Sequence, residues 1–100
     1  MSTSFDPYHK WLGIPPDQQP ANHYRLLGID LFESDADVIE AAANQRTAYL
    51  QELAAGEQVE LTQKLLNEIT QARRCLLNAD QKQAYDARLQ SQQAVVVVAN

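Results

Sequence analysis

Two stretches of helical periodicity constrain the fold of this chain more than any other feature. Apolar residues recur every three or four positions along residues 34–56 and again along residues 59–78, which places them on one face of a helix. Ser34 or Asp35 can cap the first helix, Gly56 can end it, and Asn78 can end the second. Because few residues separate the two stretches, they predict an antiparallel pair of long helices.

The apolar residues of these stretches are the predicted core. In the first helix they are Val38, Ile39, Ala42, Tyr49, Leu50 and Leu53, and in the second they are Leu61, Leu65, Leu66, Ile69, Ala72, Leu76 and Leu77. Arg46 interrupts the first apolar face. We expect its aliphatic stem to pack on the core while its charged head reaches water.

Shorter helices are predicted on either side of the pair. Residues 22–29 can form one or two helical turns between a capping Asn22 and a terminating Gly28. Residues 79–90 predict another short helix, which would contact the body through Ala84, Tyr85 and Leu89. The fold class predicted is therefore all-α, with residues 22–90 as the helical domain.

Residues 1–21 and 91–100 lie outside this helical domain. Pro15 and Pro16 disfavour a helix around them, so residues 1–21 predict an irregular, aromatic-rich arm that packs on the body with Trp11 as its anchor. The alternative is an exposed aromatic patch that waits for a partner. Residues 91–100, with the run Val95–Val98, predict a tail or the start of a linker.

The charge of the chain indicates which classes of partner it can bind. The formal net charge is −5, and residues 31–60 carry seven acids and one base. This acidity argues against nucleic acid, whose binding depends on basic side chains. Arg73, Arg74, Lys82 and Arg88 are the candidates for a basic patch, and we interpret them as a solvated surface.

The sequence also bears on location and chemistry. The single cysteine, Cys75, suits a reducing compartment, and we find no secretory signal or membrane-spanning run, so we predict a cytoplasmic location and no membrane contact within this segment. His9 and His23 form no tight pair with each other or with Cys75. We therefore predict no enzymatic activity, no metal and no cofactor.

Two motifs give the chain a family resemblance. The stretches "HYRLLGI" (residues 23–29) and "ITQARRCLLNADQKQAYD" (residues 69–86) resemble the J-domain, the module with which J-proteins engage DnaK-type chaperones. The second stretch matches the family pattern at Ile69, Ala72, Leu76, Tyr85 and Asp86. The resemblance covers residues 22–90 and implies a J-domain-like fold. The preceding "FDPYHKWLGIPP" resembles N-terminal modules of large multidomain bacterial proteins, which implies a bacterial origin and a longer chain.

The same resemblance exposes a missing motif. Active J-domains carry His-Pro-Asp after their second helix, and the corresponding positions here are Gln51, Glu52 and Leu53. Family members also present several bases on that helix, which meet an acidic chaperone surface. Arg46 is the one base of the corresponding helix in this chain. The resemblance thus implies the fold without the stimulation of a chaperone ATPase.

Together these features predict a non-catalytic protein-interaction or scaffolding module. The expected binding surface is the acidic helix around Asp37, Glu40 and Asn44, or the arm around Trp11, or both. A protein partner with a basic surface would complement it. The alternative is a divergent co-chaperone that contacts a DnaK-type chaperone through another surface.

Overall fold

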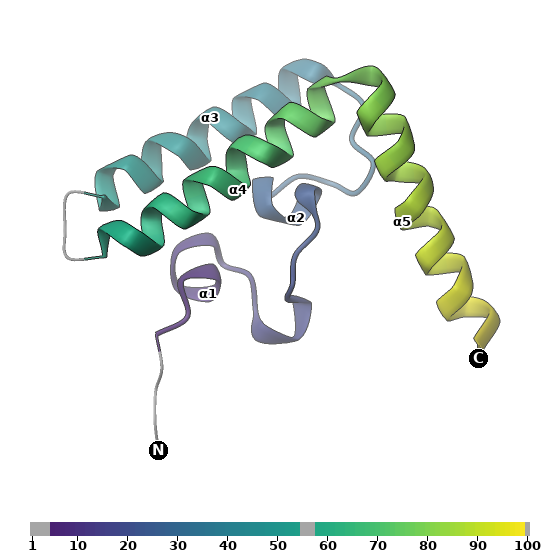
Figure 1. Ribbon diagram of the computed structural model, residues 1–100, viewed down its shortest axis with the longest axis horizontal. Helices are drawn as coiled ribbons and strands as arrows, with labels where there is room; N and C mark the ends of the chain where they lie inside the picture. Colours follow the sequence, from purple (N-terminus) through teal and green to yellow (C-terminus); the bar gives the residue numbers. More distant parts are fainter. Residues whose placement is uncertain (1–4, 55–57, 100) are drawn as a thin grey trace.

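The computed structural model describes residues 5–54 and 58–99, in which all regular secondary structure is helical (Figure 1). The elements are α1 (Pro7–Leu12), a single 3-10 turn (Pro16–Gln18), α2 (His23–Leu27), α3 (Ala36–Leu53), α4 (Val59–Leu77) and α5 (Ala79–Ala99). The all-α class and the pair of long helices are confirmed. α3 and α4 lie side by side, with α1 and α2 packed beneath them.

The α3–α4 pair supplies most of the core. Its buried apolar residues are Ile39, Ala43, Leu50, Leu65, Ile69, Ala72 and Leu76. Thr62 is also fully buried, and its hydroxyl donates to backbone carbonyls one turn earlier in α4. The prediction that Val38 and Tyr49 are buried was wrong, because their side chains are 40% and 42% exposed. A turn of 100° per residue puts both at the edge of the face that Ile39 and Leu50 bury.

The helix ends follow the expected capping chemistry in part. Asp35 caps α3 through its side chain, and Asn22 and Gly28 bound α2 as predicted. α3 ends at Leu53, and the predicted stop at Gly56 lies outside the described residues. Asn78 ends α4, and its side chain accepts the backbone N–H of Gln81 at 3.0 Å. One residue therefore separates α4 from α5.

The prediction of an irregular N-terminal arm was wrong for α1. Asp6 accepts the backbone N–H groups of Tyr8 and His9, Pro7 occupies the first helical turn, and Gly13 ends the helix in the left-handed conformation. This is a complete set of helix signals, and it precedes the two prolines that we took to exclude a helix.

The arm packs on the body, but through other residues than the expected anchor. Leu12 and Ile14 are 4% and 0% exposed and belong to the hydrophobic core. Trp11 is half-buried and makes an edge-on contact with Phe5, with ring centroids 5.2 Å apart. Leu12 and Ile14 are therefore the main anchors, and Trp11 is a partly buried residue packed against the core.

The head group of Arg46 is held by the fold, which the prediction of a head in water did not include. The residue is partly buried, and Nε donates to the carbonyl of Leu26 at 3.1 Å and Nη2 to the carbonyl of Leu12 at 3.4 Å. These carbonyls end α2 and α1, where the helix dipoles favour a positive charge. Arg25 adds a bond to the Gly13 carbonyl at 3.1 Å. Two guanidinium groups thus fasten the short helices to each other and to α3.

The prediction of a short C-terminal helix was wrong, because residues 91–99 of the predicted tail or linker start belong to the same helix. α5 is 21 residues long and continues to Ala99, through the run Val95–Val98. Residues 79–99 contain neither Gly nor Pro, so the helix meets no stop signal there. Tyr85 and Leu89 pack against the core, and beyond them α5 extends away from the α3–α4 pair (Figure 1).

Candidate functional site

A joint between α2 and α5 brings together the two sequence motifs. The backbone N–H of His23 donates to the hydroxyl of Tyr85 at 2.8 Å, and their rings stack with centroids 4.2 Å apart. One residue further along, the Tyr24 hydroxyl donates to the carboxylate of Asp86. Burial is the main cause of a raised pKa for Tyr24, and the Asp86 carboxylate raises it further, so this hydroxyl keeps its proton.

Lys82 completes the joint. Its ammonium lies 2.9 Å from the Asp86 carboxylate, in an ion pair whose two side chains are mostly buried, and 5.7 Å from the centre of the Tyr24 ring. The charge of Asp86 is thereby balanced within the fold. The joint fixes the direction of α5 relative to α2, which is a structural role.

The predicted partner surface lies on α3. Asp37, Glu40 and Asn44 are all exposed on this helix, and Glu40 pairs with Arg73 of α4 at 2.8 Å. The exposed Val38 and Tyr49 belong to the same helix. Trp11 lies on α1, beneath the α3–α4 pair and away from the end of α3 that carries Asp37 (Figure 1). The structure therefore does not join Trp11 to the other three residues.

The positions aligned with the missing tripeptide form the last turn of α3 rather than a loop. Gln51 and Glu52 are exposed, and Leu53 packs partly against the core. Backbone N–H groups in this turn donate to carbonyls one turn earlier, and Ala54 closes it with bonds to Leu50 and Gln51. A proline at Glu52, the middle position, would lack the backbone N–H that this helical turn uses and would clash with the preceding turn.

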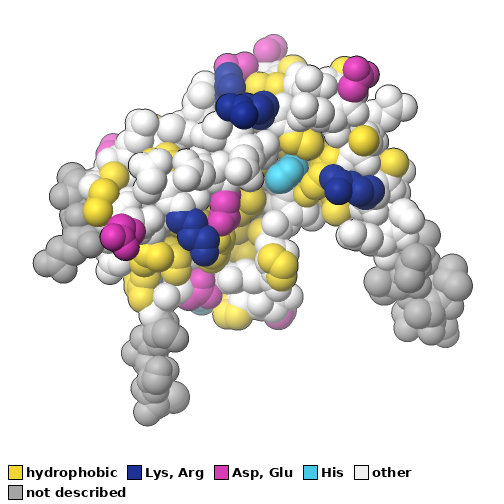
Figure 2. Space-filling view, in the orientation of Figure 1, with side chains coloured by type: hydrophobic (Ala, Val, Ile, Leu, Met, Phe, Trp, Pro, Cys, Tyr) yellow, Lys and Arg dark blue, Asp and Glu magenta, His cyan; other side chains and the backbone are white. Residues whose placement is uncertain are grey.

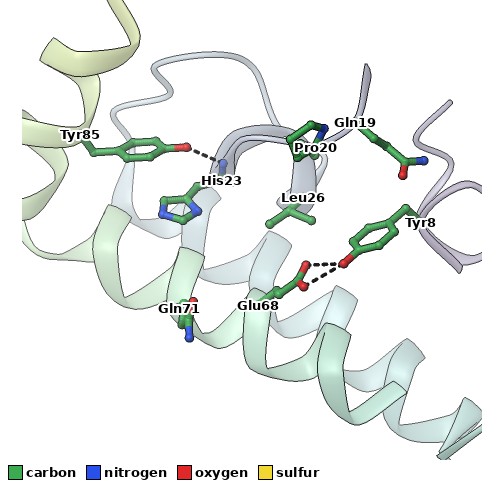
Figure 3. A pocket seen from close by; sticks show the side chains of 9 residues that line it. Tyr8, Gln19, Pro20, His23, Leu26, Glu68, Gln71 and Tyr85 are labelled. Carbon is green, nitrogen blue, oxygen red and sulfur yellow. Dashed lines mark hydrogen bonds between the residues drawn. The ribbon is translucent and has the colours of Figure 1, made fainter. Parts of the chain in front are cut away.

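A hollow of about 570 Å³ lies between α1, α2, α4 and α5 (Figure 3). Its lining combines aromatic, aliphatic and amide side chains with one carboxylate. The residues are Tyr8, Gln19, Pro20, Ala21, His23, Leu26, Glu68, Gln71 and Tyr85. Figure 2 shows hydrophobic side chains and a histidine exposed together between the helix pair and α5.

The two ends of this hollow differ in chemistry. At one end the Tyr8 hydroxyl donates to both oxygens of Glu68, at 3.0 and 2.8 Å, and these groups face each other in Figure 3. Burial and the Glu68 carboxylate raise the pKa of Tyr8 to about 12. At the other end burial, helped by the charge of Arg88, lowers the pKa of His23. His23 is therefore a neutral ring at neutral pH.

Sequence reasoning missed this hollow. Tyr8 was assigned to an irregular arm, and Glu68 received no role at all. One signal was present: Glu68 directly precedes Ile69 on the apolar face of α4, so a carboxylate stands at the border of a buried stripe. The partner of that carboxylate comes from 60 residues earlier in the chain, which periodicity does not indicate.

The structure also bears on the candidate basic patch, on Cys75 and on membrane-spanning helices. Arg88 lies 5.6 Å from the centre of the Tyr85 ring, so with Arg73 and Lys82 three of the four candidate basic-patch residues contact groups of the chain itself. Burial raises the pKa of the Cys75 thiol, whose sulfur is 3.8 Å from the Gln81 carbonyl. In the described ranges, none of the helices has the length and hydropathy to cross a membrane.

Comparison of the chain with protein-family models, curated proteins and solved structures found no match.

Proposed function

We propose that this chain is a non-catalytic protein-interaction or scaffolding module with a degenerate J-domain-like fold. The support for the fold is the meeting of the two motifs that carry the resemblance. Residues of "HYRLLGI" and of "QAYD" lie 62 positions apart in sequence, yet they bond directly through the pairs His23–Tyr85 and Tyr24–Asp86. Residues in the motifs thus serve to join the short first helix of the domain to the last.

The position of Arg46 carries the functional proposal. In the J-domain family, bases on this helix meet an acidic surface of the chaperone. Here the one base of α3, Arg46, donates its two hydrogen bonds to the carbonyls of Leu12 and Leu26, which belong to the same chain. The outer face of α3 keeps Asp37 and Glu40, and like charges oppose an acidic partner.

A protein with a basic surface fits the acidic side of α3. Asp37 and Glu40 supply the acidic groups, while the exposed Val38 and Tyr49 lie about 160–180° around the helix from Glu40 and do not add to that side. The Arg73 ion pair with Glu40 is exposed, so a partner's base can replace it at little cost. We infer that α3 is the main binding surface.

A chaperone assay tests the first half of this proposal. The purified chain is added to a DnaK-type ATPase, with a J-domain that contains His-Pro-Asp as the positive control. We expect ATP turnover to stay at its basal rate. Stimulation that rises with concentration and saturates would contradict the proposal. Saturable binding at basal turnover would instead favour the co-chaperone alternative, in which another surface makes the contact.

Crosslinking tests the second half. A photoreactive amino acid at Asn44, on the exposed face of α3, should capture a discrete partner in cells. The matched control places the same group at Gln63, an exposed position of α4. Charge reversal at Asp37 and Glu40 should abolish the adduct. Equal labelling from both positions, or an adduct insensitive to charge reversal, would show that α3 is not the binding surface.

A further inference from the structure

The hollow beside α4 has the shape of a binding site. Its volume of about 570 Å³ falls within the range of sites that enclose a small molecule or a long side chain. Four helices contribute to its lining, and none of the lining residues comes from α3. The hollow is therefore separate from the surface proposed above, and its function can be tested separately.

The charge of the lining is negative. Of its nine lining residues, one, Glu68, is an acid, and none is Lys or Arg. His23, at the opposite end, is held neutral by burial and by Arg88. Exposed Lys64, one turn before Glu68 in α4, lies outside the lining with its ammonium 5.9 Å from the centre of the Tyr8 ring.

Glu68 is held in place and retains bonding capacity. The hydroxyl of Tyr8 donates one proton, shared between the two carboxylate oxygens at 3.0 and 2.8 Å. An ionised carboxylate has about four acceptor positions. Tyr8 therefore orients the carboxylate while leaving acceptor positions for a charged donor.

The rest of the lining is suited to an aliphatic stem. Leu26 and Pro20 lie between the Tyr8–Glu68 end and the His23–Tyr85 end (Figure 3), and Ala21 adds to this apolar wall. One face of Tyr85 is covered by the stacked ring of His23. A ligand that matches the whole hollow thus has a long apolar portion and a cationic head group.

We propose that this hollow receives an arginine or lysine side chain of a protein partner, with its stem along Leu26 and Pro20 and its cation on the Glu68 carboxylate. Charge complementarity selects this occupant, because a protein ligand with an acidic side chain would place like charges together. The proposal rests on the interaction function proposed above, but this contact lies apart from the surface on α3.

Heteronuclear NMR titration with short peptides tests the proposal. The probe is a glycine-flanked arginine peptide with blocked ends, and the matched neutral probe replaces arginine by citrulline, which has nearly the same shape. We expect the arginine peptide to shift the backbone signals of His23, Glu68 and Tyr85 saturably. The citrulline peptide should bind about tenfold more weakly, the effect of one partly exposed charge-assisted hydrogen bond.

Variants locate the charge. Glu68→Gln keeps an acceptor for Tyr8 and removes the charge, so it should weaken the arginine peptide about tenfold as well. Glu60→Gln makes the same change at an exposed position two turns earlier in α4 and should leave affinity unchanged. Equal affinity for the two peptides, equal effects of the two variants, or no saturable shift would each overturn the proposal. The comparison of peptides on the unmodified chain stands even if a variant folds poorly.

Discussion

Replacement of Arg46 by methionine is the sharpest test of how the short helices are held. Met keeps an unbranched apolar stem and removes the guanidinium. The bond from Nε to the Leu26 carbonyl, at 3.1 Å, is a charge-assisted bond of the kind that contributes about 1.5–3 kcal/mol. The bond to the Leu12 carbonyl is longer, at 3.4 Å, and contributes less.

A desolvation term acts against these bonds. Burial, with a smaller effect of the Arg25 charge, lowers the pKa of Arg46, which shows that the fold disfavours this charge in part. We therefore expect Arg46→Met to lower the free energy of unfolding by about 2 kcal/mol, the lower part of the range for charged bonds. For a chain of this length that corresponds to a fall in Tm of about 8–16 °C.

Urea and thermal denaturation followed by circular dichroism would measure the change. Arg73→Met is the matched control, because it removes an exposed guanidinium whose ion pair with Glu40 is expected to contribute about 0–1 kcal/mol. If the two variants lose the same stability, or if Arg46→Met unfolds at the same urea concentration as the unmodified chain, the guanidinium does not hold α1 and α2.

Three further predictions concern packing, backbone and pH. Ile14→Ala should cost about 2–5 kcal/mol in urea denaturation, because this core side chain is fully buried. Gly28→Ala should cost more than the roughly 1–2 kcal/mol of placing a non-glycine residue in a left-handed backbone. The added cost comes from the new Cβ, which would lie 2.6 Å from Nη2 of Arg46. In a double-mutant cycle, Arg46→Met should therefore reduce this added cost. Burial lowers the pKa of His23 in the folded state below its ordinary value of 6.5. The stability that neutral His23 contributes is therefore fully present above pH 6.5 and is lost as the pH falls through the folded pKa. His23→Phe, which retains the stacking, should show a smaller loss of Tm on acidification.

The long helices could be predicted because their apolar periodicity is local in sequence. Ile39 and Leu50 on α3, and Leu65 and Ile69 on α4, lie at helical spacing within their helices and are buried as expected. Periodicity places a residue on a face but does not set the width of the buried stripe, so Val38 and Tyr49 were misplaced. α1 was predictable from Asp6, Pro7 and Gly13, but the following prolines dominated our interpretation.

The candidate site was harder to predict for a physical reason. The surface on α3 follows from acidic residues in one helix, and these are exposed as expected. The hollow depends on Tyr8 meeting Glu68 across 60 positions, and Arg46 depends on carbonyls of two other helices. Neither a side-chain partner 60 positions away nor a backbone acceptor on another helix leaves a local signal in the sequence, so neither set of partners could be identified before the fold was known.

The one-residue junction at Asn78 makes the length of the chain critical there. Each residue added to a helix turns everything beyond it by about 100°. A single insertion between Asn78 and Tyr85 would therefore rotate Tyr85 and Asp86 away from α2, and both bonds of the joint would be lost together. The same insertion between α2 and α3, in residues 30–34, would lengthen a connection that has no helical phase to preserve. We therefore expect the fold to tolerate a change of length between α2 and α3 but not between α4 and the joint residues of α5.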